Sequence, residues 1–194
     1  MKIYYLLSIA FIGFMLQGCF SHKVERVGIE ENIDLSGRWN DSDSRMTAEA
    51  MVNQILGDDW ISNHTSRTRE KPVVIVGLVY NKSHEHIDAE TFIKDVERSF
   101  VKSGRVRLVQ AGDKREELRR ERGAQQEFAS METAKKWGRE LGADYMLNGD
   151  INSIVDTYKK ERVNYYQINL ELTDLETSEI VWIGEKKIRK YIRN

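Results

Sequence analysis

The sequence is poor in the residues that cross-link or stiffen a chain. Its 194 residues include one cysteine, Cys19, and one proline, Pro72. A single cysteine cannot form a disulfide within the chain, so the fold must be held by its hydrophobic core. Because Cys19 has another predicted role, given next, the sequence also excludes thiol catalysis and cysteine-based zinc sites.

Long apolar runs are scarce as well. One follows the basic residue Lys2 and covers residues 3–16, whereas a membrane-spanning helix needs about 20 apolar residues. The run ends in Leu-Gln-Gly-Cys at residues 16–19, which is the layout of a secretory signal peptide. This ending resembles the lipobox of bacterial lipoproteins, which implies cleavage before Cys19 and a lipid on its thiol. A transmembrane helix and a plain signal peptide are the alternatives.

The chain is therefore predicted to have three parts. Residues 1–18 form a cleaved lipoprotein signal peptide, residues 19–33 a lipid anchor with a short flexible tether, and residues 34–194 a globular domain. A tether of this length reaches at most about 50 Å when fully extended.

An excess of charge of either sign is also lacking. Thirty lysines and arginines face 31 carboxylates, for a formal net charge of −1. This balance gives no electrostatic argument for nucleic-acid binding, which requires a clearly basic domain or stripe. With 40% hydrophobic and 31% charged residues, the composition is typical of an ordinary core under a heavily charged surface.

The start of the domain predicts one helix and one loop. Apolar residues at helical spacing from Ala48 to Leu56 predict a helix capped by Asp41, Ser42 or Asp43. Residues 57–71 are expected to form a polar loop around Trp60 and Ile61, and His64 falls within it. Trp39 and Trp60, which flank the helix, are interpreted as lids on the core.

A strand, a helix and a second strand are predicted next. Residues 73–79 are mostly β-branched, which predicts a strand buried on both faces. Asp88 caps a helix that ends at Gly104, and residues 105–110 form a short strand. This order is the signature of two parallel strands joined by a packed helix.

The second half of the domain changes from helix to strand. Residues 113–127 are so rich in charge that they predict a solvated helix or a mobile segment, and Ser130 caps a clearer helix ending at Gly142. From Asp144 onward, apolar and polar residues alternate through three successive strands with tight connections. The fold class predicted is α/β: a single domain with a mixed sheet of about four to five strands, a C-terminal antiparallel meander and about four helices.

One stretch has the composition of a site, the loop at residues 81–88. His84 and His86 lie two residues apart beside Glu85, but no further histidine is near, and a metal centre needs three or four ligands. The interpretation favoured is protein contact through Asn81, Lys82, Glu85 and His86, with no metal and no cofactor. No nucleophile elbow or phosphate-binding loop is found, so the prediction is that the chain is not an enzyme.

The meander is the second candidate for protein binding. Lys186, Lys187, Arg189, Lys190 and Arg193 are expected to make the last strand basic along its outer face. Basic residues on an edge strand are ordinary protection against sheet aggregation, which is the alternative interpretation. Interleaved tyrosines favour binding, because Tyr and Arg are enriched where proteins meet. The candidate contact residues in the meander are Tyr158, Arg162, Tyr165, Lys187 and Arg189.

Several short segments together resemble one family of proteins. The segments are DLSGRWNDSDS at 34–44, NKS and EHID at 81–83 and 85–88, SGRVR at 103–107, QQE at 125–127, ETAK at 132–135, GAD at 142–144 and LELTDLET at 170–177. In this order they are similar to the penicillin-binding-protein activator LpoB family, over about residues 34–192.

The resemblance implies an outer-membrane lipoprotein that faces the periplasm and has no catalytic residues of its own. Its implied partner is a bifunctional, class A penicillin-binding protein, whose peptidoglycan synthesis it stimulates, and its implied fold is similar to the N-terminal domain of TolB. Phe20, and not aspartate, follows Cys19, which allows sorting to the outer membrane. The tether is much shorter than in the well-known members of the family. The alternative is another envelope-assembly or secretion-associated lipoprotein, such as a curli-type or TolB-like binding module.

Overall fold

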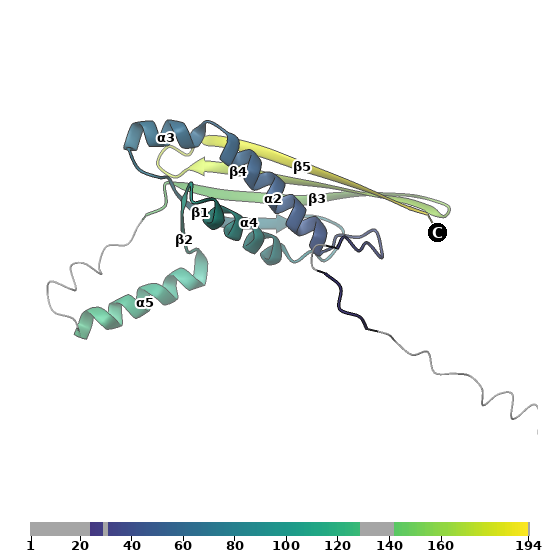
Figure 1. Cartoon of the computed structure of the whole chain (residues 1–194), viewed down its shortest axis with the longest axis horizontal. Coiled ribbons are helices and arrows are strands. Elements are labelled where there is room, and N and C mark those ends of the chain that lie inside the picture. The colour runs from purple at the N-terminus through teal and green to yellow at the C-terminus, as the bar shows by residue number, and fades with distance from the viewer. Residues whose placement is uncertain (1–23, 29–30, 129–141, 194) are drawn as a thin grey trace, which may run out of the picture. The chain divides into compact units, whose positions relative to one another are not determined.

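The computed structural model describes residues 24–28, 31–128 and 142–193, with the side chains of 122–128 left aside. The chain divides into two compact units, Met1–Glu31 and Asn32–Asn194. All helices and strands given below belong to the second unit, which is an α/β domain with a five-stranded mixed sheet (Figure 1). The predicted fold class is thereby confirmed. The helix predicted to begin at Ser130 lies outside the described residues.

The domain begins with two helices, α2 (Asp41–Gly57) and α3 (Trp60–Thr68). Asn40 caps α2 through a capping box: its side chain accepts from the amide of Asp43, and the Asp43 carboxylate accepts from the amide of Asn40. The prediction that Asp41, Ser42 or Asp43 is the cap was therefore wrong by one residue or more. Asp43 takes part in the capping box from inside the helix, because its carboxylate reaches back three residues.

The polar loop predicted for residues 57–71 is wrong, since α3 occupies most of it. Trp60, Ile61 and His64 are buried on one side of this helix. Their spacing of one, three and four residues is helical, but the helix is only 9 residues long and polar elsewhere. Trp60 is a lid on the core as predicted: its indole packs edge-to-face on Tyr145, with ring centroids 5.2 Å apart.

The predicted strand, helix and strand are confirmed as β1 (Val73–Asn81), α4 (Ala89–Ser103) and β2 (Arg107–Val109). Asp88 caps α4 by accepting from the amide of Glu90, and Gly104 ends it with a φ of 62°, where glycine is favoured. β1 pairs in parallel with β2. Burial on both faces holds only for Val73–Val76, because Leu78 and Tyr80 are exposed.

The rest of the domain contains α5 (Gly112–Phe128) and the predicted meander of β3 (Tyr145–Tyr158), β4 (Glu161–Asp174) and β5 (Ile180–Arg193). The strand order is β2-β1-β3-β4-β5, with β3 parallel to β1 and the two later pairs antiparallel. The helical alternative for residues 113–127 is thus the one confirmed.

The two faces of the sheet differ in what covers them. We call the side on which α2 and α4 pack the helix face, and the opposite side the outer face (Figure 1). Apolar side chains from alternate strand positions fill the helix face and join those helices in one core. Its largest fully buried members from the meander are Leu147, Ile151, Tyr166, Ile168, Leu170 and Leu172.

The meander continues beyond the end of β1. The last pair between β1 and β3 is Asn81 with Ile151, whereas β3 runs on to Tyr158 and stays paired with β4 throughout. In this part, the segment 34–39 covers the helix face in place of a helix. Gly37 has a φ of +66° and so close an approach to Ile192 that a Cβ would lie 2.3 Å from it. Only glycine meets both demands without strain.

Candidate functional site on the outer face of the meander

The loop at residues 81–87 is built on Asn81. Its side-chain amide donates to the carbonyl oxygens of Glu85 at 2.8 Å and Ile87 at 3.3 Å, and its oxygen accepts from the amide of Ser83 at 2.9 Å. His84 is fixed from the meander, because its amide donates to the Ser153 hydroxyl at 2.9 Å. Asn81 therefore shapes this loop through bonds to the loop's own backbone.

Glu85 links the loop to the core. One carboxylate oxygen accepts from the Trp39 amide at 3.0 Å and the other from the Tyr166 hydroxyl at 2.9 Å. Burial, and then the Glu85 carboxylate beside it, raises the pKa of Tyr166 above its usual range. Trp39 packs edge-to-face on the same tyrosine, with centroids 5.5 Å apart, which agrees with the predicted lid. Both oxygens of Glu85 thus serve the fold.

Lys82 lies at the start of a polar network that crosses the outer face. Its ammonium is 3.0 Å from the Asp150 carboxylate, which also accepts from Asn152 at 2.6 Å and Asn169 at 2.8 Å. Burial opposes ionisation of Asp150 most strongly, but the bonds from Asn169, Lys82 and Asn152 together outweigh it and lower its pKa.

The network continues across β4 to β5. Gln167 donates to Asn169 at 3.1 Å and to Glu185 at 3.2 Å, and Glu185 accepts from Lys187 at 2.6 Å. Sequence alternation predicted that these residues point away from the core. It could not show that they bond to one another, because that depends on the register between three strands.

Beyond the network, the outer face carries a hollow of about 570 Å³. It is lined by the apolar residues Ile154 and Val163 and by Tyr165, Gln167, Asp156 and Arg189. The Arg189 guanidinium lies 5.9 Å from the centroid of the Tyr165 ring, a cation–π distance. The structure therefore brings Tyr165, Lys187 and Arg189 together, with Tyr158 further along the same face.

Arg162 lies on the opposite face from these residues. Its guanidinium donates to the carbonyl oxygen of Ser36 at 3.2 Å, so it holds the segment 34–39. The expectation that all basic residues of the last strand share the outer face is wrong in the same way. Lys187, Arg189 and Arg193 are on the outer face, but Lys186 and Lys190 pair with helix-face positions of β4.

Lys190 is the most enclosed of these cations. Its ammonium lies 2.5 Å from Asp43, 2.8 Å from Asp34 and 2.8 Å from the carbonyl oxygen of Arg38. Burial is the largest single effect on its pKa and lowers it, but the bonds to Asp34 and Asp43 outweigh burial and raise the pKa. The hydrogen bond from Lys190 lowers the pKa of Asp34 in turn.

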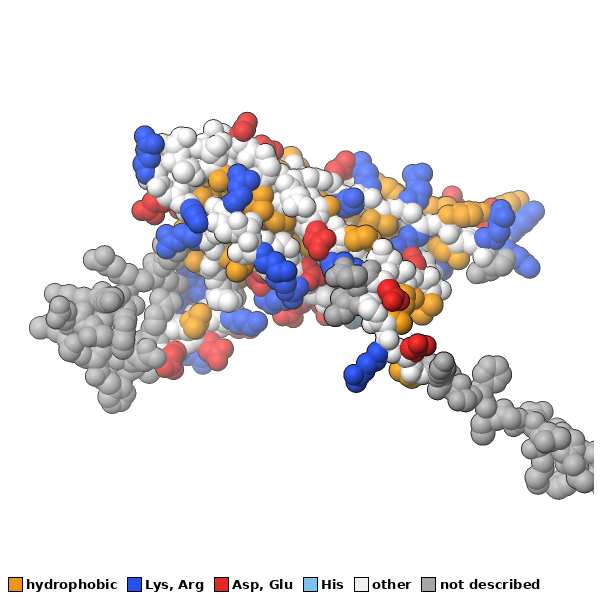
Figure 2. All heavy atoms as spheres, in the orientation of Figure 1, with side chains coloured by type: hydrophobic (Ala, Val, Ile, Leu, Met, Phe, Trp, Pro, Cys, Tyr) orange, Lys and Arg blue, Asp and Glu red, His pale blue; other side chains and the backbone are white. Residues whose placement is uncertain are grey.

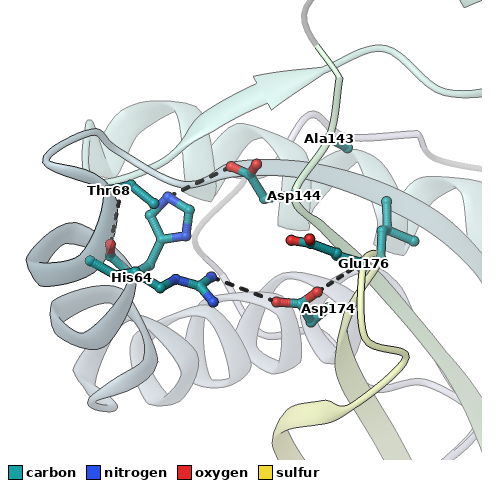
Figure 3. Close-up of a pocket in the computed structure, with 8 residues that line it drawn as sticks. His64, Thr68, Ala143, Asp144, Asp174 and Glu176 are labelled. Atoms are coloured by element: carbon teal, nitrogen blue, oxygen red, sulfur yellow. Dashed lines mark hydrogen bonds and ion pairs between the residues drawn. The ribbon is translucent and has the colours of Figure 1, made fainter.

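A second hollow, of about 580 Å³, lies between α3 and the turn joining β4 to β5 (Figure 3). His64 is buried there, with one ring nitrogen 3.0 Å from the Tyr145 hydroxyl and the other 3.7 Å from Asp144. Asp144 also accepts from the Val73 amide at 2.8 Å. Burial, and then the charge of Asp174, raises the pKa of Tyr145.

The polar groups of this hollow are engaged with each other and with the backbone. Arg67 lies 3.9 Å from Asp174, which accepts from the amides of Glu176 and Thr177 (Figure 3). The bonds of its lining residues therefore join α3 to the starts of β1 and β3 and to the turn between β4 and β5. Within the described ranges, no group of three histidine, cysteine or acidic residues is arranged to hold a metal ion.

No helix in the described part of the chain is both long and apolar enough to cross a bilayer.

The sequence matched no curated protein. Among solved structures, the LpoB C-terminal domain from Escherichia coli is similar at 18% identity and a TM-score of 0.49, over 75% of this chain and 98% of that one. The corresponding domain from Salmonella enterica is 18% identical with a TM-score of 0.47, over 75% and 98%. Lipoprotein GNA1162 from Neisseria meningitidis is 16% identical with a TM-score of 0.41, over 62% and 83%.

TM-scores below 0.5 do not by themselves show that two proteins belong to one family. The model of a family described as peptidoglycan-synthase activator LpoB matches residues 43–188. This range runs from the first turn of α2 into β5 and covers well over half of the chain. The chain therefore belongs to the LpoB family of peptidoglycan-synthase activators.

Proposed function

We propose that this protein binds a bifunctional, class A penicillin-binding protein and stimulates its synthesis of peptidoglycan, without catalysing a reaction itself. The match of residues 43–188 to the activator family is the observation that carries this proposal. Stimulation by binding requires that the activator prefer an active state of the synthase. The coupling is then reciprocal, so the active synthase also binds the activator more tightly.

The docking surface we propose is the outer face from Lys82 to the hollow beside Arg189. Three observations support this surface. It places Tyr165, Lys187 and Arg189 within one patch, and Tyr and Arg are residue types that dominate binding energy. Its hollow is lined by both apolar and polar side chains, and protein interfaces likewise combine the two. The predicted contacts Asn81, Glu85 and Arg162, by contrast, are committed to internal bonds.

For the location, we propose a lipid on Cys19 that anchors the mature protein to the outer membrane, facing the periplasm. Among the described residues, Asp34 is the first one bonded to the sheet, through Lys190. Fourteen residues, 20–33, separate it from Cys19, and they span at most about 50 Å. The synthase must therefore present its docking site within that distance plus the length of the domain from the anchoring membrane.

The central experiment adds the mature chain, from residue 19 with Cys19→Ser, to a purified class A synthase and lipid-linked precursor. Glycan polymerisation and peptide cross-linking are expected to rise with the concentration of the chain and to saturate. Unchanged rates at saturating chain would contradict the proposal. The chain incubated alone with precursor or peptidoglycan is the control, and turnover there would contradict a non-catalytic role.

The docking surface is tested with Arg189→Glu, which reverses the charge beside the hollow. We expect affinity for the synthase to fall about tenfold or more, as for a residue at the centre of an interface. Lys102→Glu makes the same charge change at an exposed position of α4 and is the matched control. Equal effects of the two variants would contradict this surface and leave the activator role standing.

A further inference from the structure

The far end of the meander has an unusual surface. We call residues 155–162 and 190–193, beyond the end of β1, the meander tip. Apolar and aromatic side chains here are open to solvent: Tyr158 is 70% exposed, Tyr191 56% and Val155 42%. Val155 points to the helix face, whereas the two tyrosines are on the outer face. Apolar surface is thus presented on both sides of a narrow end.

The meander tip is also strongly basic. Five lysines and arginines lie in its two ranges, against the two carboxylates of Asp156 and Glu161. Two of the cations lie against its tyrosines: Lys159 is 5.2 Å from the Tyr158 ring centroid and Arg193 is 5.9 Å from that of Tyr191. Figure 2 shows the result, with hydrophobic side chains along this end and basic ones around them.

Two cations at the end of the hairpin have no carboxylate partner among the described residues. Lys159 and Lys160 form the turn between β3 and β4, and no carboxylate in the described part of the chain forms an ion pair with either. Lys190 and Arg162, by contrast, bind the segment 34–39 and its neighbours. The turn therefore offers two charges to an external anionic partner.

The first bonds of the segment 34–39 to the sheet are made at the same end. Asp34 is bonded to Lys190, and Ser36 to Arg162, whose partner on β3 is Thr157 next to Tyr158. The N-terminal segment thus leaves the domain within a few residues of the tip. Only residues 20–33 lie between this point and Cys19, the lipid site on which this inference rests as part of the proposed function.

We propose that the meander tip docks on an anionic lipid surface, with the rings and aliphatic side chains at the headgroup level and Lys159 and Lys160 against lipid phosphates. Tyrosines and lysines with apolar stems are suited to this interface, because each has an apolar body and a polar end. An acidic protein partner is the competing occupant. It is disfavoured because binding energy between proteins concentrates in enclosed, central pockets, whereas this end projects with both faces exposed.

Docking at the tip orients the domain. The membrane is then at the Tyr158 end, and α3 is at the other end of β3, beside Tyr145. The outer face between them stays free for the synthase. A short tether is sufficient in this arrangement, because Asp34, where the tether joins the domain, is bonded to Lys190 of the docking tip.

The first test measures co-sedimentation of the mature Cys19→Ser chain with vesicles. Vesicles of phosphatidylethanolamine with phosphatidylglycerol are expected to bind it, and those of phosphatidylcholine alone to bind it much less. Lys159→Gln with Lys160→Gln should weaken binding about thirty-fold, at roughly five-fold for each cation near the surface. Lys102→Gln with Lys114→Gln removes the same charge from exposed positions elsewhere. Equal losses in both pairs, or no preference for anionic vesicles, would overturn the proposal.

The second test reports where the chain contacts the lipid. Because Cys19 is the only cysteine, the Cys19→Ser chain accepts a single environment-sensitive dye at Tyr158→Cys or, as control, at the exposed Asn63→Cys on α3. A blue shift on anionic vesicles at position 158 and none at 63 is expected; the reverse pattern would contradict tip docking.

Different results would contradict the two proposals, lipid docking by the meander tip and stimulation of a synthase. Loss of synthase stimulation in the soluble assay by the Lys159 and Lys160 variant, with vesicle binding intact, would favour the acidic protein partner and overturn lipid docking. A wild-type chain that binds anionic vesicles but never stimulates a synthase would contradict the proposed function and leave tip docking standing.

Discussion

Both faces of β4 and β5 carry tyrosine and lysine residues, and these side chains have different roles on the two faces. Tyr166 on the helix face is fully buried and bonded to Glu85, whereas Tyr165 on the outer face lines a hollow. Lys190 on the helix face has a side chain 11% exposed, and that of Lys187 on the outer face is 52% exposed. Residue type alone therefore does not separate the two groups.

The difference is set by strand parity and by what covers each face. Successive side chains of a strand point to opposite sides, so adjacent residues meet different surroundings. The segment 34–39 covers the helix face near the tip and supplies the Asp34 carboxylate and carbonyl oxygens to its cations. The loop 81–87 supplies the Glu85 carboxylate to the Tyr166 hydroxyl. Polar residues on that face stabilise the fold, and those on the outer face are available to a partner.

The largest expected contrast is between Lys190→Met and Lys187→Met. Lys190→Met leaves the Asp43 carboxylate, 5% exposed, without its cation, and losing one member of a buried pair is costly. We expect the free energy of unfolding to fall by ~3 kcal/mol, at the low end for such pairs because the α2 amides still stabilise Asp43. Lys187→Met should cost less than ~1 kcal/mol, because its pair is exposed. Urea denaturation measures both, and similar losses would break the comparison.

A smaller contrast is expected between the neighbouring tyrosines. Tyr166→Phe removes a buried hydroxyl that donates to the Glu85 carboxylate at 2.9 Å, and bonds to charged groups contribute roughly 1.5–3 kcal/mol. Tyr165→Phe removes a hydroxyl 3.4 Å from Gln167, and we expect a change within about 0.5 kcal/mol. Thermal unfolding of both variants provides the measurement. A Tyr165→Phe chain as unstable as Tyr166→Phe would contradict the assignment of faces.

The smallest effect concerns pH and the pair of Asp34 with Lys190. The pKa of Asp34 is lowered in the folded protein, so its contribution to stability is present above the ordinary aspartate pKa of about 4 and is lost as pH falls further. The pKa of Lys190 is raised, so its contribution is present below about pH 10 and is lost as pH rises beyond its folded value.

Asp34→Asn should therefore reduce stability most between about pH 5 and pH 10. The difference from wild type should be less than ~1 kcal/mol, since the Asp34 side chain is 42% exposed, and it should shrink toward pH 2. Denaturation curves across this range test the prediction, and a difference that grows in acid would contradict it.

Much of the fold could be predicted because local signals agreed with it. Asp88 and Gly104 bound α4 as their residue types require, and alternation gave β3, β4 and β5 in the correct order. The failures occurred where signals are short or reach across the chain. The apolar residues of helix α3 cover a single turn within a polar segment, which is too short a pattern to predict a helix. Asn40 caps α2 through a capping box that also needs Asp43.

The candidate site was predictable in part. Tyr165, Lys187 and Arg189 were chosen for residue type, and the structure gathers them on one face. Glu85 and Arg162 were chosen on the same grounds, but each binds a segment far away in sequence, at Tyr166 and Ser36. No local pattern reports such a partner, because the partner is fixed by how the segment 34–39 crosses the sheet. The hydrogen-bond network from Lys82 to Lys187 could not be predicted for the same reason.

The bonds made by the segment 34–39 have a mechanical consequence. A pull on the chain from Cys19 enters the domain first at Asp34, where Lys190 holds it, and next at Ser36 and Gly37, which bind Arg162 and Asn164. All three holding residues lie on the long strands β4 and β5. Tension is therefore carried into the sheet before it reaches Asn40, and α2 is shielded from unwinding at its first turn while those bonds last.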